Sequence, residues 1–272
     1  MMKKLLIIFG GLVITLVVIG ALLVWMVPVR APLVYGVTFS PFYAEEFGLD
    51  WKEVYVAMLD DLGMRYIRIP VYWNDTERYP NQYDFSRTDW MMNEAAKRNA
   101  RIVLAVGRKL PRWPECHDPE WSRPLSDQDR KAHLISLLNT TVNRYKNHSA
   151  LAIWQVENEP YLPFGDCPGY DAGWVDDEKG VVKASDTTHP VMITDSGELS
   201  LWIHALSRAD VFGSTMYRSV HNKIFGDITY PLPPYFFRMK RAAAELVAGK
   251  KPAVVIELQG EPWAREANYK LS

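Results

Sequence analysis

Two segments of this sequence place acidic side chains directly after strongly apolar runs. The acids are Glu157, Glu159, Glu257 and Glu261. A carboxylate at the end of an apolar strand costs free energy unless it is paired or used, so each acid could pair with an arginine, cap the next helix or take part in chemistry. Because two such ends occur in one chain, flanked by the amides of Asn158 and Gln259, the pattern favours chemistry.

Two carboxyl groups at facing strand ends can hydrolyse a glycosidic bond. One protonates the leaving oxygen, while the other attacks the anomeric carbon or activates water. The acid needs a raised pKa, which a neighbouring carboxylate supplies. The spacing alone does not say which glutamate of each pair is used.

The elements that must position these acids alternate between strand-like and helix-like patterns. Seven short strands are predicted at 33–37, 66–71, 101–106, 151–156, 191–194, 211–214 and 253–257. Helices are predicted to begin at the caps Asp50, Ser86 and Ser126, and two more cover 171–184 and 235–248. Seven βα units in one chain indicate a parallel sheet with helices outside, whose closed version is the (β/α)8 TIM barrel. The alternative is an open doubly wound sheet, but no glycine-rich phosphate-binding loop follows the first strand.

The chemistry of such barrels lies at the C-terminal ends of the strands, where both acidic segments end. The motif Asn158-Glu159-Pro160 after the fourth predicted strand, with Glu257 ending the seventh, resembles the clan A retaining glycoside hydrolases. The similarity is closest to family 5 and to related β-galactosidase-type barrels, and it covers residues 33–263. It implies Glu159 as the acid/base, Glu257 as the nucleophile and Asn158 as the contact to the sugar 2-hydroxyl. We expect the two carboxyl groups to lie about 5–5.5 Å apart, as in retaining enzymes.

Other residues fit this resemblance in part. Arg68 lies inside the apolar second strand, where the clan places an arginine that orients the nucleophile; a surface ion pair is the alternative. Tyr217 follows the sixth strand, where the clan places a tyrosine that hydrogen-bonds the nucleophile; a packed core tyrosine is the alternative. Three tryptophans, Trp113, Trp121 and Trp263, are candidate sugar-stacking platforms, and loop or core packing is the alternative for each.

The sequence also departs from the family in two places. Family 5 usually has a histidine at the end of the third strand, but here His117 comes later, so it either folds back to the sugar or supports the loop. Only 15 residues follow Glu257, and 264–272 contains no convincing strand. A parallel crossover takes about a dozen residues before its strand begins, so we expect the barrel to lack its eighth βα unit. The first and seventh strands would then have unpaired edges.

Composition and charge exclude several classes of protein. The chain has 31 basic and 32 acidic residues, a net charge of −1, which argues against nucleic-acid binding. Its six histidines show neither His-x-His nor His-Glu-x-x-His spacing, which argues against a metal-dependent barrel hydrolase. No cofactor is expected.

The N-terminal segment is the most apolar part of the chain. Residues 5–27 carry no charge and, as a helix, would reach about 34 Å, enough to cross a bilayer. Lys3 and Lys4 precede them and favour a cytoplasmic N-terminus. The run is longer than a signal-peptide core, so an uncleaved signal anchor is favoured over a cleaved signal. We therefore expect two domains. Residues 1–30 form a cytoplasmic tip and membrane anchor, and residues 31–272 form the incomplete barrel outside the cytoplasm.

The two cysteines, Cys116 and Cys167, lie in the loops after the third and fourth predicted strands. Adjacent strands of a parallel barrel place these loops side by side, and a compartment outside the cytoplasm permits a disulfide. Two buried free thiols are the alternative.

The expected function is a membrane-anchored, extracytoplasmic glycosidase that acts on β-linked oligo- or polysaccharides by double displacement with retention. The alternative is a non-catalytic carbohydrate-binding protein on the same fold.

Overall fold

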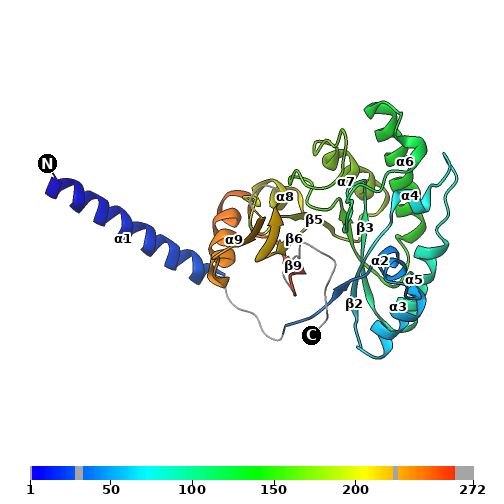
Figure 1. Cartoon of the computed structure of the whole chain (residues 1–272), viewed down its shortest axis with the longest axis horizontal. Helices are drawn as coiled ribbons and strands as arrows, with labels where there is room; N and C mark the ends of the chain where they lie inside the picture. The colour runs from blue at the N-terminus through cyan, green and yellow to red at the C-terminus, as the bar shows by residue number, and fades with distance from the viewer. Residues whose placement is uncertain (1, 28–32, 223–225, 261–272) are drawn as a thin grey trace.

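The computed structural model describes residues 2–27, 33–222 and 226–260. Its central sheet has seven parallel strands, which run in sequence order around the barrel (Figure 1). They are β1 (Val37–Thr38), β2 (Tyr66–Pro70), β3 (Arg101–Val106), β4 (Leu151–Val156), β5 (Val191–Asp195), β6 (Val211–Met216) and β9 (Ala253–Leu258). The architecture is therefore a TIM-type α/β barrel, as predicted. Among the described residues, β1 and β9 are the two end strands of the sheet.

Helices cover the outside of the sheet, and their starting residues follow the predicted caps in two of three cases. The larger ones are α3 (Trp51–Asp60), α5 (Ser86–Lys97), α6 (Asp127–Tyr145), α7 (Trp174–Ser185) and α9 (Pro234–Ala248). Asp50 accepts hydrogen bonds from two backbone N–H groups of α3, and Ser126 accepts one from α6. Ser86 is instead the first residue of α5, because the side chain of Asp84 accepts a hydrogen bond from the backbone N–H of Ser86 at 2.9 Å.

The first strand is shorter than predicted, and the prediction for 33–36 is wrong. Strand β1 contains only Val37 and Thr38, which pair with Ile67 and Arg68 of β2. Residues 33–35 make no ladder and are about two-thirds exposed, so their apolar character does not mark a strand.

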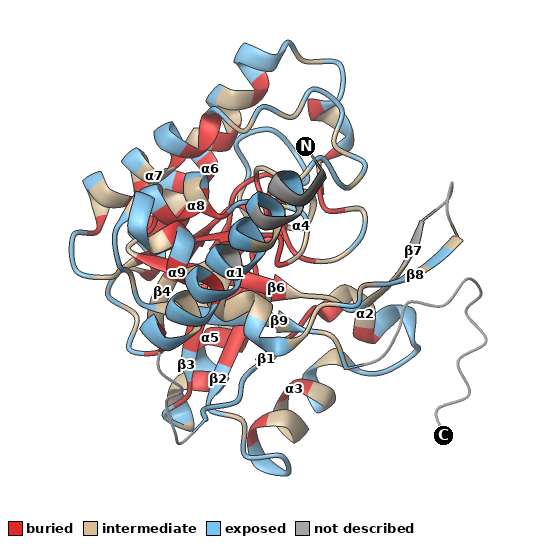
Figure 2. Ribbon diagram, turned by 90° about the vertical axis from the view of Figure 1, so that its left-hand side faces the viewer, coloured by how far each residue is buried: buried red, intermediate tan, exposed pale blue. Residues whose placement is uncertain are grey.

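Short elements in the loops were not predicted. They are α2 (Pro41–Glu46), α4 (Trp73–Thr76), α8 (Ile203–Arg208), the 3-10 turn Glu120–Ser122, and an antiparallel hairpin of β7 (Ser219–Asn222) and β8 (Gly226–Thr229). The hairpin follows β6 directly and projects from the barrel in Figure 2. Its base is tied to the segment after β9, because Gln259 accepts the backbone N–H groups of Arg218 and Ser219.

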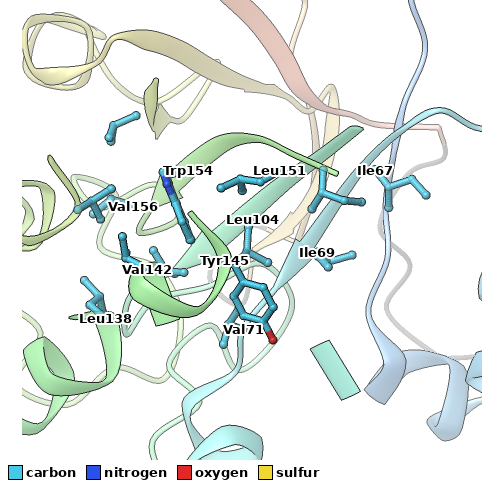
Figure 3. Packing of buried hydrophobic residues seen from close by; sticks show 14 of the residues in the cluster. Ile67, Ile69, Val71, Leu104, Leu138, Val142, Tyr145, Leu151, Trp154 and Val156 are labelled. Atoms are coloured by element: carbon cyan, nitrogen blue, oxygen red, sulfur yellow. The ribbon is translucent and has the colours of Figure 1, made fainter. Parts of the chain in front are cut away.

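Apolar side chains between the strands and the outer helices form the core. Buried residues are red in Figure 2, and many of them lie on the strands of the sheet. Figure 3 shows residues of β2, β3 and β4 packed against the apolar face of α6, which includes Leu138, Val142 and Tyr145. Trp154 is fully buried there, and its indole N–H donates to Asp186 at 2.9 Å. This packing holds the C-terminal ends of the central strands in place.

The N-terminal helix α1 (Met2–Met26) extends away from the barrel (Figure 1). Within the described residues it is the one helix that is long and apolar enough to cross a membrane, over Ile8–Met26. Arg238 of α9 donates to the carbonyl oxygens of Val24 and Val27, so the C-terminal end of α1 lies against α9. The predictions for 264–272, Trp263 and Glu261 fall outside the described residues.

Candidate active site

The acidic segment after β4 turns sharply and sends its two glutamates to different partners. Glu157 and Glu159 have φ angles of 58° and 43°, in the left-handed region that few non-glycine residues adopt. Glu157 is buried and accepts the backbone N–H groups of Arg108 and Lys109 at 2.5 and 2.8 Å. A Cβ on Gly107 would lie 2.3 Å from this carboxylate, which explains the glycine. Glu157 therefore joins β4 to the loop after β3.

Glu159 points instead toward the end of β6. Its backbone N–H donates to Thr194 Oγ1 at 2.8 Å, and its carboxyl Oε1 accepts a hydrogen bond from the hydroxyl of Thr215 at 2.7 Å. Within the described ranges the carboxyl pairs with no cation. Burial, and then the negative charge of Glu257, raise the pKa of Glu159 to about 7. This carboxyl can hold a proton near neutral pH.

Glu257 ends β9 in a different environment. Arg68 Nη2 donates to its Oε1 at 2.7 Å, and the hydroxyl of Tyr217 donates to its Oε2 at 2.5 Å. Burial alone would raise the pKa of Glu257, but the charge of Arg68, the Tyr217 hydrogen bond and the charge of Arg112 hold it below its ordinary value. This carboxylate stays ionised over the whole neutral range. The predicted contacts of Arg68 and Tyr217 with Glu257 are both confirmed.

Asn158 links the two acidic segments through Arg68. Arg68 Nη2 donates to Asn158 Oδ1 at 3.2 Å as well as to Glu257, and Gln155 Nε2 donates to the same Oδ1 at 3.4 Å. The side chains of Arg68, Asn158 and Gln155 are all buried. Strands β2, β4 and β9 are thereby joined by one hydrogen-bonded network at their C-terminal ends.

His117 lies in the loop after β3 and makes loop contacts. Its ring is packed on Tyr72, with centroids 4.0 Å apart, and its Nε2 lies 3.3 Å from the carbonyl oxygen of Arg112. Burial lowers the pKa of His117 to about 4, so the ring is neutral. These contacts fit the loop-supporting alternative.

The candidate tryptophans separate into different environments. Trp113 is 60% exposed and meets Phe164 edge-on, so its ring is available for stacking. Trp121 packs against Trp73 and donates its indole N–H to the carbonyl oxygen of Glu77, which is a structural position.

The predicted disulfide is confirmed. Cys116 and Cys167 are bonded, with Cα atoms 5.1 Å apart. The bond ties the loop after β3 to the loop after β4 at the edge of the site.

Three polar residues of the site were missed by the sequence analysis. Thr215 holds the carboxyl of Glu159; Lys109 Nζ donates to the carbonyl oxygens of Glu159 and Leu162; and Glu115 accepts the side-chain amide of Asn158 at 3.0 Å. Only Glu115 could have been found from the sequence, because it is the neighbour of Cys116, which was already expected at this end of the barrel.

Over the described parts of the chain, no group of three or more His, Cys, Asp or Glu could hold a metal ion.

Comparisons with known proteins identify a family and similar folds. Residues 58–230 match the family described as "Glycosyl hydrolases family 2, TIM barrel domain". Two curated relatives are the β-galactosidase BgaA of Clostridium cellulovorans and the β-galactosidase LacZ of Heyndrickxia coagulans. The first is 20% identical over 182 residues, or 59% of this chain and 28% of the relative. The second is 26% identical over 151 residues, or 49% of this chain and 22% of the relative. The chain thus spans about a quarter of the length of these relatives.

Solved structures share the fold. A β-galactosidase from Bacillus circulans sp. alkalophilus aligns with a TM-score of 0.57 at 15% identity, over 82% of this chain and 44% of that one. Endo-glycoceramidase II from Rhodococcus sp. aligns with a TM-score of 0.56 at 13% identity, over 82% of this chain and 65% of that one. The family matched is family 2, which corresponds to the β-galactosidase-type part of the predicted resemblance.

Proposed function

This chain belongs to the TIM-barrel domain family of the family 2 glycosyl hydrolases, and we propose that it hydrolyses β-glycosidic bonds with retention of configuration. The observation that carries the proposal is the opposite electrostatic environment of its two site carboxyls. Burial and the charge of Glu257 raise the pKa of Glu159, whereas Arg68 and Tyr217 hold the pKa of Glu257 down. A retaining glycosidase needs one protonated and one ionised carboxyl at the same pH.

The first step uses both carboxyls at once. The Glu257 carboxylate attacks the anomeric carbon and forms a covalent glycosyl ester, while Glu159 gives its proton to the glycosidic oxygen, which leaves as the alcohol. Arg68 and Tyr217 hold the attacking carboxylate through separate oxygens, Oε1 and Oε2. Asn158, held by Arg68, contacts the sugar 2-hydroxyl, where hydrogen bonds strengthen in the transition state.

The second step reverses the roles. Once Glu257 is an ester it carries no charge, so its contribution to the raised pKa of Glu159 disappears. The pKa of Glu159 then falls, and its carboxylate removes a proton from the water that cleaves the ester. We expect the two carboxyl groups to be about 5–5.5 Å apart for this mechanism.

The proposed substrate is a β-linked oligo- or polysaccharide outside the cytoplasm. The exposed ring of Trp113 beside the site can stack on a sugar face. The apolar span Ile8–Met26 of α1, the lysines Lys3 and Lys4 that precede this span and the Cys116–Cys167 disulfide support a membrane anchor with the barrel in an oxidising compartment. Protease accessibility of the barrel in intact cells, compared with lysed cells, tests this orientation.

A covalent-trapping experiment tests the mechanism. The full chain in detergent is incubated with a panel of 2-deoxy-2-fluoro β-glycosyl fluorides, and peptide mass spectrometry locates the label. We expect one sugar on Glu257, no label in Glu257→Gln, and normal labelling of Glu120→Gln, whose side chain is exposed. Binding of sugars without labelling or turnover would instead support the non-catalytic alternative.

A further inference from the structure

A third carboxyl group, Glu115, reaches the site from the loop between β3 and α6. Its residue is only 6% exposed, and its Oε2 accepts Asn158 Nδ2 at 3.0 Å. The mechanism above gives it no role as acid or nucleophile. It contacts the side chain that the mechanism places against the sugar.

The loop fixes Glu115 through several independent constraints. Its φ is 74°, so the backbone adopts a conformation that costs free energy for a residue with a Cβ. Its N–H donates to the carbonyl oxygen of Arg112, and its own carbonyl oxygen accepts the N–H of Leu110, both at 2.8 Å. The next residue forms the disulfide to Cys167, and a Cβ on Gly165 would lie 2.7 Å from the Cβ of Glu115. The loop therefore fixes the backbone from which this side chain extends.

Among the described residues, the hydrogen bonds of Asn158 leave one of its two amide hydrogens without an assigned partner. Its Oδ1 accepts from Arg68 and Gln155, which are both donors, so this atom must be the oxygen. One Nδ2 hydrogen goes to Glu115. An amide nitrogen carries two hydrogens in a plane, so fixing the first one also fixes the direction of the second.

We propose that Glu115 is a positioning residue, which anchors one hydrogen of the Asn158 amide so that the other is directed at the 2-hydroxyl of the bound sugar. This inference rests on the proposed function, in which Asn158 contacts that hydroxyl. Without Glu115, the oxygen of the amide is still held by two donors, but its nitrogen end has no fixed partner.

The chemistry of a carboxyl group at this position fits the task. Burial, together with the charges of Glu257 and Glu159, raises the pKa of Glu115 to about 8, although the Asn158 hydrogen bond and the charge of Lys109 lower it. A protonated carboxyl keeps an acceptor oxygen for the amide without adding a negative charge beside the nucleophile. A glutamine, which also offers an acceptor oxygen, should therefore replace it well.

The test compares Glu115→Ala and Glu115→Gln on matched aryl β-glycosides with and without the 2-hydroxyl, using the full chain in detergent. For Glu115→Ala we expect kcat/KM to fall about 10- to 100-fold on the 2-hydroxy substrate and less than about threefold on the 2-deoxy substrate. Glu115→Gln should stay within about fivefold of the unmodified chain on both, because it preserves the hydrogen bond. Glu120→Ala, an exposed acid of the same loop, is the matched control.

An equal loss on both substrates, or no loss on either, would overturn the proposal. If the unmodified chain hydrolyses neither substrate and takes no label from the fluoroglycosides, the proposed function itself has failed. Crystal structures of the full-length variants then decide the role of Glu115. The Asn158 side chain should be displaced in Glu115→Ala and unmoved in Glu115→Gln, and an undisturbed Asn158 in both variants would refute the positioning role.

Discussion

The ends of β4 and β9 carry the same type of side chain in the same barrel, yet they shift its pKa in opposite directions. At the end of β4, Glu159 is 7% exposed and its carboxyl accepts a hydroxyl from Thr215. At the end of β9, the side chain of Glu257 is 15% exposed and is held by a guanidinium and a phenol. Burial disfavours the charged form at both ends, so burial does not distinguish them. The difference is the position of the cation. Arg68 forms an ion pair with Glu257, whereas the negative charge of Glu257 raises the pKa of Glu159.

The largest expected effect comes from removing the acid at the end of β4. Glu159→Gln should lower kcat/KM by about 10²- to 10⁴-fold on aryl glycosides with poor leaving groups, because a general acid contributes that much. The loss should be far smaller with dinitrophenyl glycosides, whose leaving group needs no proton. The fall in the activity of the unmodified chain above about pH 7 should also disappear, since that fall reports loss of the Glu159 proton. A pH–rate series on both substrates measures this, and an alkaline fall that persists in the variant contradicts the assignment.

A smaller effect is expected when the cation at the end of β9 is removed. Arg68→Met should lower kcat/KM by about 10- to 10³-fold, because the nucleophile loses both its orientation and its favourable charge. The pKa of Glu257 should rise, so the acidic limb of the pH profile should move to higher pH. Arg65→Met, which removes an arginine whose contacts are to the carbonyl oxygens of Leu59 and Met64, is the control. An unchanged acidic limb in Arg68→Met would remove Arg68 from this role.

The smallest effect is on stability. The pKa of Glu159 is about 7 in the folded chain against an ordinary 4.5, so the folded state binds the proton more tightly than the unfolded state. Its contribution to the free energy of unfolding is then present below pH 4.5 and is lost as pH rises through 7. Glu159→Gln removes this dependence and should be more stable than the unmodified chain at pH 8 by up to about 3 kcal/mol, with little difference at pH 4. Urea unfolding at the two pH values, with Glu120→Gln as control, measures it; a variant that is less stable at pH 8 contradicts the raised pKa.

Local sequence signals predicted the regular elements well. The bounds 101–106 and 151–156 match β3 and β4, and the caps at Asp50 and Ser126 are present, because capping and strand periodicity depend on neighbouring residues. The first strand was mislocated because an apolar segment becomes a strand only where a partner strand is in register with it. The short helices and the β7–β8 hairpin lie in loops, whose shape depends on what they pack against.

Several predicted contacts at the C-terminal ends of the strands are present in the structure. The resemblance to clan A implied that Arg68 and Tyr217 contact Glu257, and both hydrogen bonds are present. Adjacent loops bring Cys116 and Cys167 together, as the order of the parallel strands predicted. Lys109 and Glu115 could not be assigned in this way, because their side chains reach the site through irregular backbone with no periodicity to follow.

The sequence by itself determined that carboxyl groups follow two strands whose ends share one face of a parallel barrel, because apolar runs and strand order are written in the chain. The spacing alone left open which glutamate after β4, Glu157 or Glu159, would act, and only the resemblance carried by Asn158-Glu159-Pro160 favoured Glu159. The tertiary structure decided how these two carboxyl groups differ, because the left-handed turn at both positions sends them to different partners. The carboxylate of Glu157 accepts hydrogen bonds from the backbone N–H groups of Arg108 and Lys109. The carboxyl of Glu159 accepts one from Thr215, and the negative charge of Glu257 raises its pKa. Residue type supplies a carboxyl group, but its solvation and its neighbours set its protonation state.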